Sequence, residues 1–297
     1  MKLRTKILTG VVLGLALIEI GIRISGIIDF PLYDADNHIG YIPKPNQSGS
    51  FLRTHDWQFN SLSMGATEFR PTDKDTDTLL IGDSIVLGSN PYKQGDRLGP
   101  QLQLIHGGNV WPISAGSWAL RNELVYLNLH PEVVAAVDEL IFVLNSGDFA
   151  EASSWACEET HPRSYPIYAT AYVIKKYIYN WSTCGTIPTD LKVPEGDWKS
   201  ELKHLLSSQL INDKKVSFFL YPDKNEFADD ALQVERLESH AIELVNSGAT
   251  KVYNVGRDLR WTDKQLYRDG IHPSVLGTGV LARIIYSPQK QSILVNK

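Results

Sequence analysis

A serine, an aspartate and a histidine occur in this chain with a spacing that suits covalent ester chemistry. Ser84 lies in the motif G-D-S-I directly after the apolar run Thr78–Ile81, and Asp269 and His272 lie near the other end of the chain in D-G-I-H-P. A serine hydroxyl is a weak nucleophile near neutral pH, so it needs a histidine within hydrogen-bond reach and a carboxylate that orients the histidine. The three residues are therefore predicted to form a catalytic triad.

Each half of this pattern also has a structural explanation. G-D-S after a short strand is a common exit from a sheet, because glycine turns freely and Asp or Ser caps a following helix. The pair Asp269-Gly270 suits an ordinary turn, and Pro273-Ser274 suits the start of a helix. The two motifs together, at opposite ends of a chain in which strands and helices are expected to alternate, favour the triad.

The pairing of G-D-S early with D-x-x-H late resembles the SGNH (GDSL-type) hydrolase family from Thr78 to Ile285. The resemblance implies that a glycine after the second strand and an asparagine after the third join the backbone N–H of Ser84 in holding the oxyanion. Gly116 falls at the glycine position. The third strand runs into N-S-G-D where the family pattern reads Gly-x-Asn-Asp, so Gly147 replaces the asparagine in strict register. Asn145, two residues earlier, is predicted as the third donor, and the oxyanion hole is where this chain departs from the family.

Composition excludes several other classes of protein. The 297 residues are 43% hydrophobic and 21% charged, which suits a folded domain with a sizeable core. A net charge of −5 and no basic run after residue 6 argue against a nucleic-acid surface. The sequence has no Gly-rich phosphate loop and no cluster of His and Cys at metal-ligand spacing, so we expect no cofactor and no metal.

The N-terminus predicts a membrane anchor. Basic residues within the first six positions precede an apolar stretch from Ile7 to Ile28, and its ~22 residues meet the ~20 that a transmembrane helix needs. Glu19 and Arg23 interrupt the stretch one helical turn apart, so they can pair. A cleaved signal peptide is an alternative, although no small-x-small cleavage site follows, and a helix lying on the membrane surface is another. The flanking positive charge places the rest of the chain outside the cytoplasm, in the periplasm or at the cell surface.

The remaining chain predicts alternating strands and helices. Short apolar strands separated by helices are typical of a parallel sheet covered on both faces, whose strand ends gather the catalytic loops at one edge. We therefore expect an α/β fold: a three-layer, flavodoxin-like SGNH domain with a mostly parallel, five-stranded sheet, preceded by one transmembrane helix. The expected strands are Thr78–Ile81, Val110–Ser114, Glu139–Leu144, Val216–Tyr221 and Lys251–Val255; the expected helices are Arg97–Ile105, Leu120–Leu127, Trp198–Leu210, Ala231–Asn246 and Val275–Tyr286.

The predicted domain organisation has four parts. Residues 1–28 are the cytoplasmic stub and anchor, 29–76 are a Pro- and Gly-rich lead-in that packs on the domain, 77–288 are the hydrolase domain, and 289–297 are a tail. An insertion at 149–194 contains Cys157 and Cys184, which form a disulfide in an oxidising compartment or remain as two free cysteines. It also carries aromatic and polar residues that suit a sugar, or that pack the insertion onto the domain: Trp155, His161, Arg163, Tyr165, Tyr168, Tyr172, Tyr177, Tyr179 and Trp181.

These observations together predict a membrane-anchored serine esterase or O-acyltransferase with Ser84, His272 and Asp269 as its triad. The resemblance implies that its substrate is an ester, such as the O-acetyl groups of an extracellular carbohydrate or polysaccharide. The acyl group, its acceptor and the choice between hydrolysis and transfer are open at this stage. The alternative is a noncatalytic SGNH-fold scaffold or carbohydrate-binding protein in an envelope polysaccharide assembly, which the altered N-S-G-D motif favours.

Overall fold

A six-stranded sheet forms the centre of the computed structural model, which describes residues 2–179 and 184–296. The strand order is β6-β5-β7-β8-β9-β10; the first five strands are parallel, and β10 runs antiparallel to β9. This order of the parallel strands is that of a flavodoxin-like sheet, so the predicted fold class is confirmed. The strands are β5 (Asp77–Gly82), β6 (Asn109–Ser114), β7 (Glu139–Leu144), β8 (Lys215–Leu220), β9 (Lys251–Asn254) and β10 (Ile293–Asn296).

The prediction of five strands was wrong because β10 lies in the segment that we expected to be a tail. This strand has only four residues and pairs with one neighbour at the edge of the sheet, where residues 293 and 295 lie opposite Tyr253 and Val252. So short a strand is defined by its pairing partner and has little pattern of its own.

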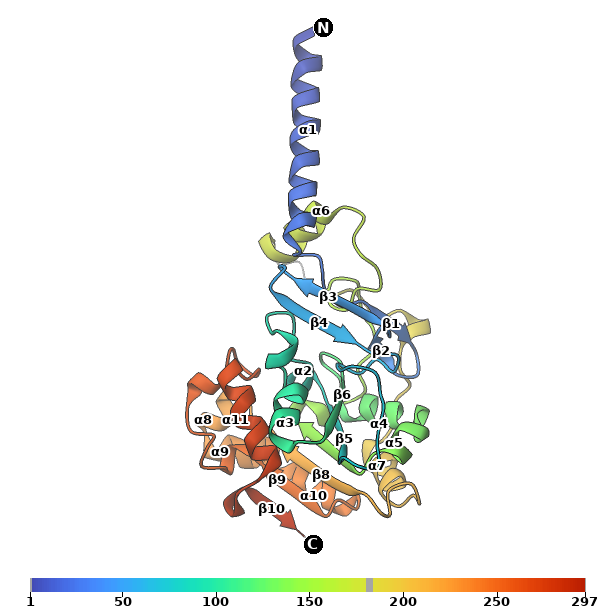
Figure 1. Ribbon diagram of the computed structural model, residues 1–297, viewed down its shortest axis with the longest axis vertical. Coiled ribbons are helices and arrows are strands. Elements are labelled where there is room, and N and C mark those ends of the chain that lie inside the picture. Colours follow the sequence, from blue (N-terminus) through green and yellow to red (C-terminus); the bar gives the residue numbers. More distant parts are fainter. Residues whose placement is uncertain (1, 180–183, 297) are drawn as a thin grey trace.

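Helices cover both faces of the sheet (Figure 1). Within β5, Leu79 and Ile81 are buried on one face and Leu80 on the other, as expected for a strand between two layers. One layer contains α3 (Leu98–His106) and α11 (Val275–Tyr286), and the other contains α4 (Leu120–Leu129), α5 (Pro131–Ala136), α7 (Trp198–Leu206) and α10 (Ser239–Asn246). The shorter helices are α2 (Ser84–Leu87), α6 (Ala169–Val173), α8 (Lys224–Ala228) and α9 (Asp230–Gln233).

The lead-in forms two β-hairpins that pack on the α/β domain. The hairpins pair β1 (Tyr33–Asp36) with β2 (Gly40–Pro43), and β3 (Gln47–Phe51) with β4 (His55–Phe59). The indole Nε1 of Trp118 donates to the carbonyl oxygen of Tyr41 at 2.7 Å, which joins β2 to the loop after β6. Residues of the lead-in therefore reach the edge of the sheet at which the parallel strands end.

Helix α1 (Lys2–Ser25) projects away from the domain (Figure 1). Its segment Arg4–Ser25 is long and apolar enough to cross a membrane, and none of it is buried, so it is not a core helix. The predicted pairing within this helix is confirmed, because Arg23 Nη2 lies 2.7 Å from Glu19 Oε1.

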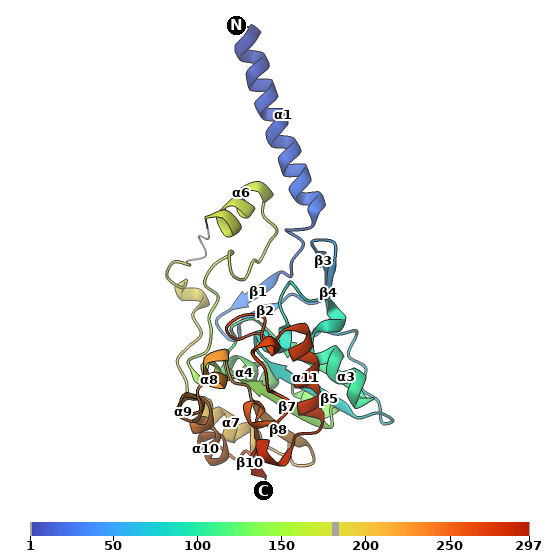
Figure 2. The same ribbon diagram turned by 90° about the vertical axis from the view of Figure 1, so that its left-hand side faces the viewer.

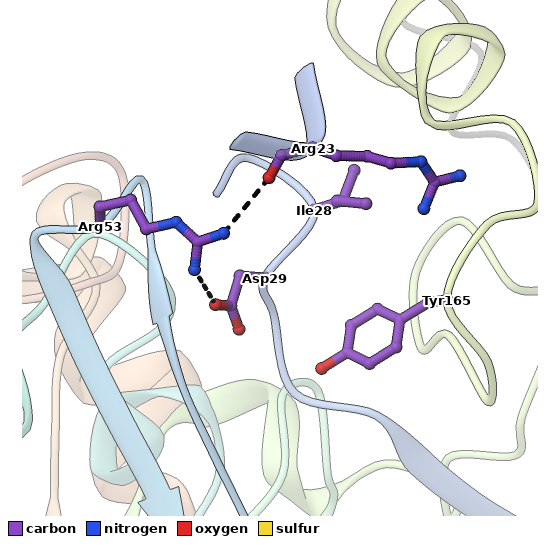
Figure 3. Close-up of a pocket in the computed structure, with 5 residues that line it drawn as sticks. All are labelled: Arg23, Ile28, Asp29, Arg53 and Tyr165. Atoms are coloured by element: carbon purple, nitrogen blue, oxygen red, sulfur yellow. Dashed lines mark hydrogen bonds and ion pairs between the residues drawn. The ribbon is translucent and has the colours of Figure 1, made fainter. Parts of the chain in front are cut away.

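The end of α1 is attached to both the lead-in and the insertion. Arg53 donates from Nη1 to Asp29 Oδ2 at 2.9 Å and from Nη2 to the carbonyl oxygen of Arg23 at 3.3 Å (Figure 3). Glu19 accepts hydrogen bonds from the backbone N–H groups of Ala169 at 2.8 Å and Thr170 at 2.9 Å, and so caps α6, which lies beside α1. Figure 2 shows α6 beside the domain-proximal end of α1.

Candidate active site

Ser84 lies where β5 turns sharply into α2. A side chain on Gly82 would place its Cβ 2.6 Å from Val86 Cγ2 and 2.8 Å from the carbonyl oxygen of Val143, so the turn requires glycine at this position. Asp83 caps α2, because its Oδ1 accepts the backbone N–H of Ile85 at 2.8 Å. The strand end and the cap together fix the Ser84 backbone at the carboxyl edge of the sheet.

The structure brings the three predicted triad residues together. His272 Nε2 lies 3.0 Å from Ser84 Oγ, and His272 Nδ1 lies 3.0 Å and 2.9 Å from the two carboxylate oxygens of Asp269. When Nδ1–H donates to Asp269, Nε2 is left to accept the proton of Ser84. This is the arrangement in which a histidine acts as general base toward a serine.

Several donors hold Asp269 in its ionised form. Burial opposes ionisation, but the backbone N–H groups of Ile271 and His272, with the side chains of Arg268 and His272, lower the pKa of the carboxyl below its usual value. Arg268 Nη2 lies 3.0 Å from Asp269 Oδ2. The charge that orients His272 is therefore present throughout the neutral pH range.

A short loop fixes the position of His272. Tyr267 and Pro273 form an isolated antiparallel bridge, and the backbone N–H of Arg268 donates to the carbonyl oxygen of His272 at 2.8 Å. Ser274 then caps α11 by accepting the N–H of Gly277 at 3.1 Å. His272 is thus held between a closed turn and the start of a buried helix.

The two predicted oxyanion residues after β6 and β7 differ in orientation. Gly116 lines the same cavity as Ser84, and its carbonyl oxygen accepts the hydroxyl of Tyr41 at 2.7 Å, which fixes the peptide. Asn145 faces inward: its Nδ2 donates to Asp83 Oδ2 at 3.1 Å and to Asp148 Oδ1 at 2.9 Å. Both amide protons of Asn145 are thus already used, so it can donate to an oxyanion only by releasing one of these carboxyls.

A cluster of buried carboxyl groups lies beneath Ser84. Asp83, Asp148 and Glu123 are 4%, 3% and 0% exposed, and neither oxygen of Glu123 has a hydrogen-bond partner among the described residues. Burial raises the pKa of all three, and repulsion between the carboxyls raises those of Glu123 and Asp148 further. Sequence reasoning missed this cluster, because Glu123 lies in a polar stretch of α4 that has the composition of an exposed helix face.

Ser84 opens into a cavity of about 470 Å³ with walls from three parts of the chain. The lead-in contributes Tyr33 and the insertion contributes His161 and Tyr177. The His161 ring stacks on Tyr41 with centroids 3.8 Å apart, and burial lowers its pKa to about 4, so this imidazole is neutral at physiological pH. Sequence reasoning did not single out Arg97, which also lines this cavity.

The aromatic residues of the insertion divide between the two roles that the sequence left open. His161 and Tyr177 line the cavity, whereas Tyr165 and Tyr172 pack against Phe30 of the lead-in. Trp155 is 5% exposed and is covered by the guanidinium of Arg163, whose Cζ lies 3.9 Å from the ring centroid. Tyr168 and Tyr179 are exposed, and Trp181 lies outside the described residues.

The two cysteines of the insertion are joined. Cys157 and Cys184 form a disulfide across 27 residues, with their Cα atoms 5.4 Å apart. The closed loop contains Thr160, His161 and Tyr177, all of which line the cavity. Within residues 2–179 and 184–296, no group of three or more His, Cys, Asp or Glu side chains is arranged to hold a metal ion.

Comparison with known proteins adds the following similarities. No family model and no curated protein matches the chain. Among solved structures, a protein from Slackia heliotrinireducens proposed to be an SGNH hydrolase shares 15% identity at a TM-score of 0.41, covering 72% of this chain and 98% of its own. A protein from Desulfitobacterium hafniense, proposed to be a lipolytic member of the G-D-S-L family, shares 14% identity over 71% and 99% of the two chains, with a TM-score of 0.41. A family two carbohydrate esterase from Clostridium thermocellum, solved in complex with cellohexaose, shares 14% identity at a TM-score of 0.42. The match covers 75% of this chain and 65% of the esterase chain. At these identities and TM-scores, the assignment of function depends on the side chains described above.

Proposed function

We propose that this protein is a serine esterase or O-acyltransferase of the SGNH type. The observation that carries the proposal is the continuous hydrogen-bonded path from Ser84 Oγ through His272 to Asp269, with both distances at His272 near 3.0 Å. Ser84 attacks the ester carbonyl, His272 takes its proton and returns it to the leaving alcohol, and Asp269 stabilises the imidazolium. Water or a second alcohol then releases the acyl group from Ser84.

The oxyanion is held by backbone N–H groups in this proposal. The Ser84 N–H is at the first position of α2, and Gly116 lies in the same cavity at the end of β6. A preorganised donor of this kind typically contributes about 10²–10³-fold to the rate. The side chain of Asn145 is the third candidate donor, but it would have to give up its hydrogen bond to Asp83 or Asp148.

The proposed substrate is an acylated carbohydrate, with O-acetyl groups on an extracellular sugar or polysaccharide as the leading case. The cavity beside Ser84 has the volume of a small-molecule site and is lined by aromatic rings and a few polar groups. Such a lining suits the faces and hydroxyls of a sugar ring.

We further propose that α1 is retained as a single-pass anchor and that the domain lies on the periplasmic or extracellular side. Glu19 and Arg23 lie within α1 and both contact the insertion, Glu19 at Ala169 and Arg23 Nη2 at the carbonyl oxygen of Ile167 at 2.6 Å. A signal peptide that is removed has no need for contacts with the mature domain. If the full-length protein remains in membranes after carbonate washing with an intact N-terminus, the anchor is supported; a soluble form that begins near Asp29 would contradict it.

The nucleophile is tested by Ser84→Ala in the full-length protein. We expect hydrolysis of a model acetate ester to fall by at least about 10³-fold, because the triad members act as a unit. A fluorophosphonate probe should label the wild-type protein but not the variant. The exposed Ser207→Ala serves as the control and should keep both activity and labelling.

The same measurement decides between enzyme and scaffold. A folded wild-type protein that neither cleaves esters nor takes up the probe would favour the noncatalytic carbohydrate-binding alternative. Turnover by Ser84→Ala near the wild-type rate would refute the assignment of the nucleophile.

A further inference from the structure

Arg97 is a buried arginine with no anionic partner in the part of the chain that the structure describes. It is 4% exposed, and its Nε has no hydrogen-bond partner. Among the described residues, no carboxylate lies within ion-pair distance of its guanidinium group and no side chain or carbonyl accepts a hydrogen bond from it. An arginine stays protonated in proteins, so its burial without a partner has a cost that must be offset elsewhere.

A second buried arginine, Arg121, has the ion pairs and hydrogen bonds that are expected when a buried guanidinium has a structural role. Arg121 is 6% exposed, and its guanidinium contacts Glu201 at 3.0 Å, Glu151 at 3.4 Å and the carbonyl oxygen of Pro194 at 3.0 Å. Arg121 lies in α4, joins this helix to α7 and to the insertion, and does not line the Ser84 cavity. The two residues differ in partners and not in burial.

Arg97 lines the cavity into which Ser84 opens. Its stem crosses the end of α2, where a Cβ on Gly88 would lie 2.9 Å from Arg97 Cγ, and Gly88 has a φ of +79°. The missing side chain at Gly88 thus makes room for the arginine within one turn of Ser84. This packing fixes the stem of Arg97 at the cavity that the proposed nucleophile also lines.

The surroundings leave the charge of Arg97 uncompensated. Burial lowers its pKa to about 10, and the groups that oppose this effect are Tyr33, which is buried and neutral at physiological pH, and Asp56, which is exposed. His161, which lines the same cavity, is neutral at physiological pH because burial lowers its pKa to about 4. The cavity is therefore positive near Arg97, and the missing partner is an anion.

We infer that Arg97 binds a negatively charged substituent of the ester substrate, such as the carboxylate of a uronic acid. Its planar guanidinium can donate two parallel hydrogen bonds to a carboxylate. A bound substrate would supply the partner that is absent among residues 2–179 and 184–296, and acylated acidic sugars would be preferred over neutral ones. This inference rests on the proposed function, because it assigns the substrate class of the Ser84 site.

Matched ester pairs test the inference in the full-length protein. The first pair is O-acetylated methyl glucuronoside and O-acetylated methyl glucoside, which places the charge on the alcohol; the second is 4-nitrophenyl hemisuccinate and 4-nitrophenyl acetate, which places it on the acyl group. We expect the wild-type protein to prefer the charged member of one pair and Arg97→Gln to lower that ratio of kcat/KM values by about 10- to 100-fold. Arg97→Lys should restore part of the ratio. Arg121→Gln should lower stability and leave the ratio unchanged.

Binding separates this inference from the proposed chemistry. Methyl glucuronoside should bind the Ser84→Ala protein about tenfold more tightly than methyl glucoside, as measured by ligand-observed NMR, and Arg97→Gln should remove the difference. If neither ester is cleaved but the charged sugar binds through Arg97, the proposed function fails and the anion site stands. If esters are cleaved by Ser84 with no preference for charge in either pair, or if Arg97→Gln leaves the preference intact, the anion site is refuted.

Discussion

Asp269 contacts His272 and Asp83 contacts Ser84, yet the two carboxyl groups have opposite surroundings. The side chain of Asp269 is 44% exposed and accepts charged and backbone donors that lower its pKa, whereas Asp83 is 4% exposed beside two further buried carboxyls and has a raised pKa. Environments that separate the pKa values of neighbouring carboxyls assign them different tasks. Here Asp269 orients the base, and Asp83 caps α2 and so supports the backbone of the nucleophile.

The difference also affects the proton of Ser84. Its hydroxyl has two acceptors within reach, His272 Nε2 at 3.0 Å and Asp83 Oδ2 at 3.2 Å. An ionised Asp83 would be the stronger competitor, because hydrogen bonds to a charged acceptor are stronger than those between neutral groups. The raised pKa of Asp83 shifts its carboxyl toward the neutral form, which weakens this competition with His272.

Removing the charge of Asp269 should have the largest effect on activity. Asp269→Asn removes the charge that stabilises the imidazolium and favours the wrong tautomer of His272, so kcat should fall by about 10⁴-fold. The measurement is ester release by the folded variant. Asp263→Asn, an exposed change in the same loop, is the control. A loss below about tenfold would show that His272 does not depend on this carboxylate.

Removing the side chain of Asn145, which donates to the buried Asp83, should have a smaller effect. It should lower stability rather than kcat. Asn145→Ala leaves Asp83 and Asp148 without their shared donor, so we expect a loss of about 1–3 kcal/mol in the free energy of unfolding. The folded variant should keep most of its kcat. A fall in kcat of about 10²-fold at unchanged stability would instead assign Asn145 to the oxyanion hole, as the sequence predicted. Thermal melts and kinetics on the same preparation distinguish the two.

The smallest effect should be a change in pH dependence at Glu123. A carboxyl with a raised pKa in the folded state contributes stability that is present below its unfolded value, near 4.5, and lost as pH rises toward the folded value. In the wild type, this titration lowers the free energy of unfolding by up to about 1.4 kcal/mol per pH unit. Glu123→Gln should remove this loss, so the stability of the variant relative to the wild type should rise between about pH 5 and pH 8. Unfolding at both pH values measures this, with the exposed Glu235→Gln as control. Parallel curves for wild type and Glu123→Gln would show that Glu123 is ionised in the fold.

The parallel strands of the sheet and the meeting of the three triad residues could be predicted from the sequence. All five predicted strands are present with shifts of one residue or fewer at their ends, because each is a short apolar run between helices. Ser84 and the pair Asp269–His272 could be joined because parallel strands place their loops at one edge, whatever their distance in the chain.

The parts that could not be predicted depend on partners from other segments. The helix expected from Ala231 to Asn246 is divided into α9, a π-helical turn over Val234–Glu238 and α10. The burial of Glu123 and the missing partner of Arg97 are properties of tertiary packing, and the local sequence around each suits a solvated surface. The inward orientation of Asn145 likewise requires Asp83, which lies 62 positions earlier.

The capping of α6 by Glu19 bears on how the protein should be prepared. Glu19 lies inside the apolar helix that is usually deleted to obtain a soluble protein, and the segment that it caps continues into Tyr177 on the cavity wall. A truncated protein that begins after α1 would lose this cap and the contact of Arg23 with Ile167. Kinetic constants measured on such a protein would describe a cavity in which the segment that contains Tyr177 has lost its contacts with α1. Detergent or nanodisc preparations of the whole chain are therefore the appropriate material for assigning its substrate.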